Sequence, residues 1–287
     1  MWYVFIVMPI LALIKTTLQG RYSKSNIKTF SDLLLYNSAV YLVATITLAI
    51  IFLRQMPPIE VFLYATLSGI LSILFQTFYT LAFRNGPVAP TVIIISFNIV
   101  LILIAGTIFF EESWSIFAII GFVFMAAAFY LLPAKGGDKK ANLKWAIFIT
   151  LTFLFSGLGG VVTLFFSHSQ FSAYNSEYST LFFAIALVLC SLLTLLNVKV
   201  KKDPITIKKD WKLPTVALVI GVALGIYNLV MVIAFEHFPS YIVSPITNAT
   251  LMVLVMVLNC ILDKEKPTKK MIFGLISAVI GIVLLNL

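Results

Sequence analysis

Long apolar stretches, separated by short charged ones, run through the whole chain. Runs such as Val92-Ile93-Ile94-Ile95 lack the alternation of apolar and polar positions that a barrel strand needs, so the stretches predict helices. A bilayer core of about 30 Å takes about 20 helical residues per crossing. The pattern therefore predicts ten membrane-spanning helices, over residues 2–20, 33–53, 60–83, 88–110, 114–132, 144–166, 178–197, 213–235, 240–262 and 270–287.

The composition excludes a water-soluble fold. Of the 287 residues, 61% are hydrophobic and 11% are charged, whereas a soluble domain carries about 25% charged residues. Only helices and closed barrels satisfy their backbone polar groups in lipid, so the chain is expected to be an all-α membrane protein. The first apolar stretch has no basic segment before it and no small-residue cleavage site, so it predicts a helix and not a signal peptide.

Positive charge is distributed unevenly between the two predicted sides of the membrane. The loops after the first, third, fifth, seventh and ninth spans hold 18 of the 20 Lys and Arg residues. Arg54 lies on the other side, and Lys15 lies within the first span. The positive-inside rule makes the basic side cytoplasmic, so both termini are expected outside, in a plasma membrane. The short loops suit a bacterial inner membrane. This charge has a topological explanation, so no nucleic-acid partner is predicted.

The two halves of the chain match each other weakly. A shift of 152 residues aligns glycine, amide, proline and acidic positions, namely Gly69 with Gly221, Gln76 with Asn228, Pro87 with Pro239 and Glu111 with Asp263. The predicted organisation is a first repeat over 1–132, a basic cytoplasmic linker over 133–143 and a second repeat over 144–287. Because each repeat has five spans, an odd number, the second repeat must be inverted relative to the first.

Particular residues carry a resemblance to a known family. The run from Ala82 to Thr91, followed by Glu111 and Gly121, resembles the EamA-type repeat of the drug/metabolite transporter superfamily, and Pro239, Asp263 and Gly274 repeat it in the second half. The resemblance implies a ten-helix carrier made of two inverted five-helix repeats. It also implies a substrate cavity lined by the first four helices of each repeat, with the fifth helices packing the repeats together.

Polar residues at membrane depth are the candidate solute ligands. All 11 acidic residues fall in loops or near span ends, which disfavours proton-coupled export of lipophilic cations through an embedded carboxylate. Neutral polar residues instead recur at helical spacing. Each either hydrogen-bonds a neighbouring helix or binds a neutral or zwitterionic metabolite. The substrate-binding candidates among them are Asn37, Tyr41, Gln76, Tyr79, Asn98, Asn228, Ser244 and Asn248.

Lys15 is the one charge predicted within a span, and it joins the candidate ligands. At 1.5 Å per residue it lies about 20 Å along the first helix from Trp2, in the cytoplasmic third of the membrane. Its side chain either extends to the headgroups or faces the cavity. In the cavity it would bind a substrate carboxylate or phosphate, or change its protonation state during transport.

Proline and small residues have structural interpretations. Pro90 and Pro245 either begin the fourth and ninth helices or act as hinges there. Small residues at close-packing spacing predict interhelical contacts, including a dimer contact in the last helix. These are Ser156 and Gly160, Gly221 and Gly225, and Gly274, Ala278 and Gly281.

The function favoured by these features is a carrier that moves a small metabolite by alternating access, as a monomer or a homodimer. An intramembrane enzyme is disfavoured, because His168 and His237 fall in loops and no nucleophile elbow exists. Cys190 and Cys260 cannot build a disulfide framework or a zinc site, and no metal or cofactor is predicted. The alternative is a membrane scaffold or partner subunit that transports nothing.

Overall fold

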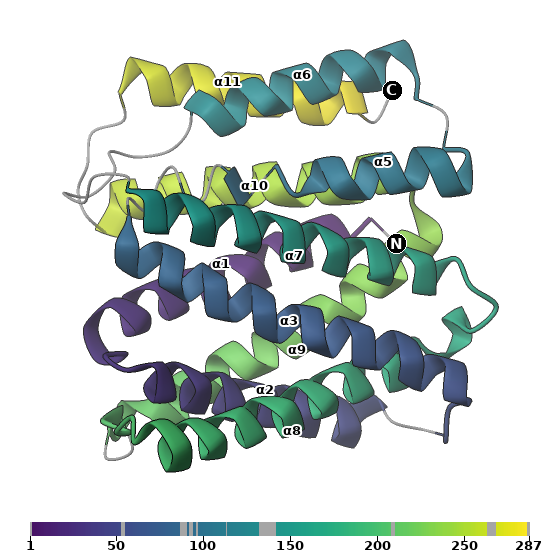
Figure 1. Ribbon diagram of the computed structural model, residues 1–287. Helices are drawn as coiled ribbons and strands as arrows, with labels where there is room; N and C mark the ends of the chain where they lie inside the picture. The colour runs from purple at the N-terminus through teal and green to yellow at the C-terminus, as the bar shows by residue number, and fades with distance from the viewer. Residues whose placement is uncertain are drawn as a thin grey trace.

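The fold is a bundle of helices that run along a common direction (Figure 1). The computed structural model describes residues 2–52, 55–86, 91, 94–95, 97–112, 114–131, 142–207, 210–262 and 268–285. No strand occurs among them, and their helices are α1 (Val4–Asn26), α2 (Phe30–Phe52), α3 (Ile59–Asn85), α5 (Ile99–Phe110), α6 (Ile116–Leu131), α7 (Leu143–Ser167), the 3-10 helix η1 (Ser172–Tyr174), α8 (Asn175–Lys201), α9 (Lys212–His237), α10 (Ser240–Leu262) and α11 (Lys269–Leu285).

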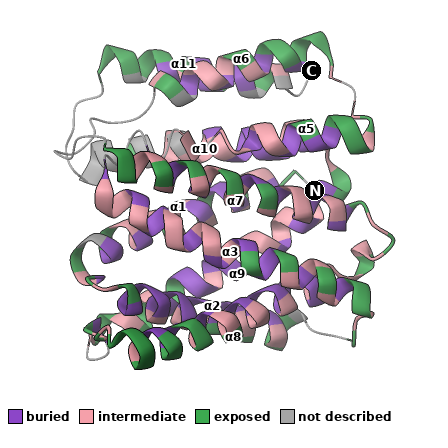
Figure 2. Ribbon diagram, viewed as in Figure 1, coloured by how far each residue is buried: buried purple, intermediate pink, exposed green. Residues whose placement is uncertain are grey.

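Apart from α5, the helices lie within a few residues of the predicted spans. Six described segments are long and apolar enough to cross a membrane, and three shorter apolar helices accompany them. Large apolar residues such as Ile50, Ile108 and Val200 are exposed. The buried positions lie mainly on the helix faces that turn toward other helices (Figure 2). Because many large apolar side chains are exposed on the outside of the helices, lipid is the natural solvent of the bundle. The all-helical membrane fold predicted from the sequence is confirmed.

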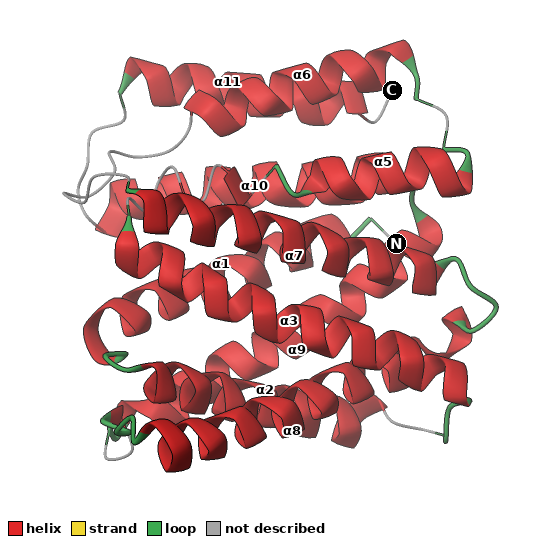
Figure 3. Ribbon diagram, in the orientation of Figure 1, coloured by secondary structure: helices red, strands yellow, loops and turns green. Residues whose placement is uncertain are grey.

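One predicted span is not a continuous α-helix over its described part. The range 88–110 contains α5, but α5 begins only at Ile99. Before it, Phe97 and Asn98 donate backbone hydrogen bonds to Ile94 and Ile95, three residues back, and form a turn (Figure 3). The side chain of Asn98 leaves this turn to donate to Ser156 of α7. Polar side-chain bonding of this kind stabilises an interrupted helix inside a membrane protein.

The structure bears differently on the prolines that were interpreted as helix starts or hinges. Pro90 lies outside the described residues, as do Pro87, Asp263 and most of the predicted linker, residues 133–141. Pro245 is the sixth residue of α10, beyond the first turn, so it does not begin the helix. Pro239 lies immediately before Ser240, the first residue of α10, as the predicted range 240–262 places it.

The helices pack mainly as pairs that join an early to a late part of the chain. α2 packs on α8, α3 on α7, α1 on α9, and α6 on α11. The α6–α11 pair lies along one edge of the bundle in Figure 1, and α2 and α8 lie along the opposite edge. Both chain ends lie at one end of the bundle, and the α1–α2 and α8–α9 connections lie at the other.

Several of the predicted small residues lie where helices approach closely. A Cβ atom on Gly221 of α9 would lie 2.6 Å from Val43 Cβ and 2.7 Å from the Val40 carbonyl oxygen of α2. In α11, Gly281 faces Gly121 and Met125 of α6 in the same way. The contacts of Gly281 are therefore made within one chain.

Alanine at Gly221 is expected to destabilise the fold, because the Val40 backbone cannot yield as a flexible side chain can. We expect a loss of about 1–3 kcal/mol in unfolding free energy, typical of overpacking. Gly20 of α1 has nothing within 4 Å of its would-be Cβ. Its alanine variant should instead gain up to about 1 kcal/mol from helix propensity. Unfolding of the purified variants in detergent measures the change in unfolding free energy for each. Equal changes in the two variants would contradict the close contact between α9 and α2 at Gly221.

Candidate solute cavity

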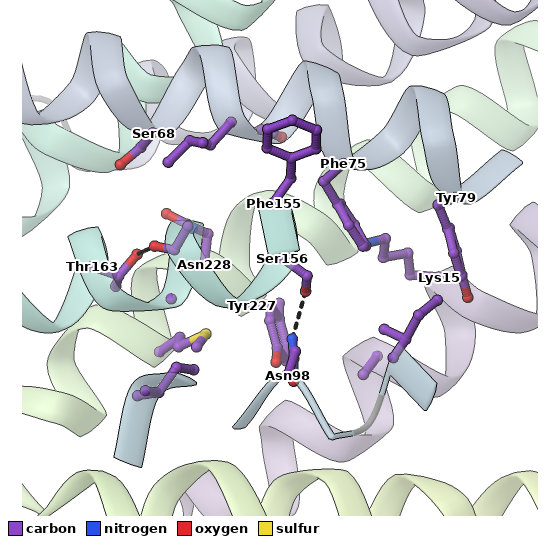
Figure 4. A pocket seen from close by; sticks show the side chains of 18 of the residues that line it. Lys15, Ser68, Phe75, Tyr79, Asn98, Phe155, Ser156, Thr163, Tyr227 and Asn228 are labelled. Atoms are coloured by element: carbon purple, nitrogen blue, oxygen red, sulfur yellow. Dashed lines mark hydrogen bonds between the residues drawn. The ribbon is translucent and has the colours of Figure 1, made fainter. Parts of the chain in front are cut away.

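A cavity of about 270 Å³ lies among α1, α3, α5, α7, α9 and α10 (Figure 4). This volume is large enough for several water molecules or one small solute. Its polar lining comes from helices of both halves of the chain. The residues that contribute it are Lys15, Thr16, Ser68, Ser72, Tyr79, Asn98, Ser156, Thr163, Tyr227, Asn228 and Asn248.

Aromatic residues and one ammonium group line one part of the cavity. Phe75 and Tyr79 of α3 stack with ring centroids 5.4 Å apart, because residues four apart share a helix face. Lys15 Nζ lies 5.8 Å from the centroid of the Phe75 ring. A cation over a ring face at this distance gains an attractive cation–π contact. The Lys15 side chain therefore faces the cavity, and the extension to the headgroups is not observed.

Amides and hydroxyls line another part. Asn98 Nδ2 donates to Ser156 Oγ, joining the turn before α5 to α7. Thr163 Oγ1 donates to the Gly159 carbonyl oxygen at 3.0 Å and lies 3.5 Å from Tyr178 Oη of α8. The Oδ1 atom of Asn228 is buried and accepts no hydrogen bond from the described residues. An unsatisfied buried acceptor costs free energy unless a bound molecule or water donates to it.

A second hollow of about 50 Å³ adjoins the cavity. It shares Asn98, Tyr227 and Asn248 with the larger cavity and adds Ser244 of α10. Ser244 Oγ is buried and has no hydrogen-bond partner in the described chain. The polar lining therefore continues beyond the main volume.

The structure brings most of the predicted ligands together. Lys15, Tyr79, Asn98, Asn228 and Asn248 line the main cavity, and Ser244 lines the adjoining hollow.

The other three predicted ligands, Asn37, Tyr41 and Gln76, do not line either volume. Tyr41 Oη lies 3.0 Å from Ser72 Oγ, so Tyr41 supports a lining residue from behind. Gln76 Oε1 accepts a hydrogen bond from Gln19 Nε2 at 2.8 Å and joins α3 to α1. Asn37 is buried, with its Nδ2 unpartnered among the described residues.

Sequence reasoning missed several lining residues. Ser156 was predicted only as a packing residue, together with Gly160, but it lines the cavity. Gly160 does pack against Ile102 of α5. Thr16 and Tyr227 each adjoin a predicted ligand in sequence, so they lie on neighbouring helix faces. Thr163 lies seven residues after Ser156, two helical turns along the same face of α7. That spacing was the available signal.

Carboxylates hold the loops at one end of the bundle. Asp32 of α2 accepts hydrogen bonds from Thr206 N and Ile207 N, at 2.6 and 3.1 Å, in the segment before α9. Asp210 accepts from the backbone N–H of Lys212, from Tyr22 Oη and from Asn26 Nδ2. These bonds, led by the one from Lys212, lower the pKa of the Asp210 carboxyl below its ordinary value.

The comparisons with known proteins agree with this architecture. The model of the EamA-like transporter family matches residues 143–287. No curated protein matches the chain. A solved structure, titled only as the crystal structure of a protein, is similar with a TM-score of 0.74 and 13% identity. The match covers 99% of this chain and 98% of that one. This likeness concerns the fold. The chain is a multi-pass membrane protein that belongs to the EamA-like transporter family, within the drug/metabolite transporter superfamily.

Proposed function

We propose that the protein is a carrier that moves a small polar metabolite across a membrane by alternating access. The observation that carries the proposal is the cavity, whose lining combines residues from both halves of the chain with unsatisfied polar atoms. Groups that lack protein partners are available to a solute. Its amides and phenols suit a neutral or zwitterionic metabolite, as the sequence predicts.

An inverted repeat is the second part of the proposal, and the helix neighbours support it. If α1, α2 and α3 correspond to α7, α8 and α9, then α3 on α7 has its counterpart in α9 on α1. The contact of α2 with α9 likewise corresponds to that of α8 with α3. The α2–α8 and α6–α11 contacts would each lie across the axis that relates the halves. Two halves related in this way can rock about a central site.

A pair of carboxylates supports the same correspondence. Asp32 is the third residue of α2, and Glu177 is the third residue of α8. Asp32 accepts from Thr206 N in the segment before α9. Glu177 accepts from Gln55 N, at 3.3 Å, in the segment before α3. Each half thus uses an acid early in its second helix to hold the segment that precedes the third helix of the other half.

The orientation in the membrane follows from charge. Described basic residues gather at the end of the bundle that holds the α1–α2 and α8–α9 connections, among them Arg21, Lys28, Lys199, Lys201 and Lys202. We place this end in the cytoplasm and both termini outside, in a plasma membrane of the bacterial inner type.

Side-specific labelling tests alternating access. Thr163→Cys, in a chain with Cys190→Ala and Cys260→Ser, places a thiol in the cavity lining. We expect a membrane-impermeant thiol reagent to label it from both sides of sealed vesicles, because the cavity must open to each side in turn. Ser25→Cys, exposed in the last turn of α1, is the control and should label from the basic side alone. Labelling of Thr163→Cys from one side alone would indicate a scaffold or a fixed crevice.

A further inference from the structure

Lys15 carries a positive charge that the described protein does not balance. Its contact with the Phe75 ring is the interaction that the structure gives it. The described acids lie in loops or in the terminal turns of helices, among them Asp32 at the start of α2 and Glu236 at the end of α9. No described carboxylate forms an ion pair with Lys15.

An ammonium group needs more than one aromatic ring when it lies within a membrane protein. Lysine has three N–H donors, and a cation–π contact engages the charge without supplying a hydrogen-bond acceptor. A charge removed from bulk water is stabilised by an opposite charge at hydrogen-bonding distance. The cavity beside Lys15 has room for that partner, since its volume is about 270 Å³.

We propose that an anionic oxygen group of the transported solute, a carboxylate or a phosphate, is the partner of Lys15. The proposal rests on the proposed function and shifts its substrate class from a neutral or zwitterionic metabolite to one that carries an anionic oxygen group, which a zwitterion also has. Binding would pair the ammonium group of Lys15 with the anionic group of the solute. With a monoanion bound, the positive and the negative charge in the cavity would cancel. Neutral solutes would leave Lys15 unpaired, and they would bind more weakly for that reason.

A second feature defines the rest of the solute. The buried Oδ1 atom of Asn228 can only accept a hydrogen bond, and no described residue donates to it. The solute would therefore also carry a hydroxyl or an N–H group. Phe75 and Phe155 offer it apolar surface in the same cavity. The class is a small hydroxylated or aminated anion.

Matched probes test this class. The pairs are lactate with lactamide, mandelate with mandelamide, and glycerol phosphate with glycerol, in which charge changes while hydroxyl and carbon skeleton stay nearly constant. A probe that binds the folded protein raises its melting temperature by mass action. We expect at least one anion, at millimolar concentration, to stabilise the detergent-purified protein more than its uncharged partner does. The lactate and mandelate pairs test whether the site binds a carboxylate, and the glycerol phosphate pair tests whether it binds a phosphate.

Variants connect the effect to Lys15. We expect Lys15→Met to weaken binding of the stabilising anion about 10- to 100-fold, the usual loss when a charge-assisted hydrogen bond disappears. Lys15→Arg should keep the anion preference. Lys201→Met removes an exposed positive charge from the end of α8 and should bind like the unmodified protein. The melting temperature of each variant without probe reports whether it folds.

Three results would overturn the proposal. They are equal stabilisation by charged and uncharged partners, anion binding that Lys15→Met leaves unchanged, and no stabilisation by any anion of the panel. The melting measurement needs no transport. Anion binding through Lys15 without two-sided labelling of Thr163→Cys would therefore contradict the carrier and leave the anion site standing.

Discussion

Alanine at Asp32 is expected to destabilise the protein by about 3 kcal/mol, the order of magnitude for buried donors that lose a charged acceptor. The Asp32 carboxylate is fully buried and accepts hydrogen bonds from four backbone N–H groups and from the Thr206 hydroxyl. Ile207 N–H is itself buried, so water cannot easily replace its acceptor. Asp32→Asn, which retains one acceptor oxygen, should be intermediate.

The control for this prediction is another acid in a first helical turn. Glu60 begins α3 in the same way, but its side chain is exposed. Glu60→Ala should change the unfolding free energy by less than about 0.5 kcal/mol, as surface substitutions usually do. Denaturation of the three variants in one detergent gives the comparison. Similar losses for Asp32→Ala and Glu60→Ala would show that the buried network adds nothing to stability.

Leucine at Gly159 is expected to abolish solute binding and transport while the protein still folds. Gly159 lines the cavity, and a Cβ atom placed on it would have nothing within 4 Å. A larger side chain can therefore enter the empty volume without displacing a neighbouring helix. Leucine is also a better helix former than glycine, by up to about 1 kcal/mol. We expect an unchanged or higher melting temperature together with a loss of binding.

The matched variant is Gly20→Leu. Gly20 also has open space around its would-be Cβ, but it does not line the cavity. It should fold and retain binding of any solute that stabilises the unmodified protein. Retained binding in Gly159→Leu, measured by melting temperature and by flux, would mean that the solute binds elsewhere.

The sequence predicted the helices well because one physical quantity determines them. The cost of exposing polar backbone to lipid forces each apolar run into a helix, so α9 and α10 lie within a few residues of their predicted ranges. The break before α5 was not predicted; beside it, the side chain of Asn98 donates a hydrogen bond to Ser156, in another helix. Hydropathy along one segment contains no information about such a partner.

The candidate site was predictable only in part, for a related reason. Helical spacing indicates which face of a helix avoids lipid, but a protected face can meet either a cavity or another helix. Tyr79 meets the cavity, whereas Gln76, three residues earlier, is occupied by Gln19 of α1. Lys15 posed the same choice between headgroup and cavity. Its contact with Phe75 in the folded chain decides that choice.

Flux through the reconstituted protein tests the central claim most directly. Vesicles that contain the protein and an excess of an unlabelled solute, chosen because it raises the melting temperature, are diluted into a trace of the same solute in radiolabelled form. A carrier predicts transient accumulation of label inside by exchange, abolished by Gly159→Leu and retained by Gly20→Leu. Label that enters no faster than in vesicles without protein would contradict the account.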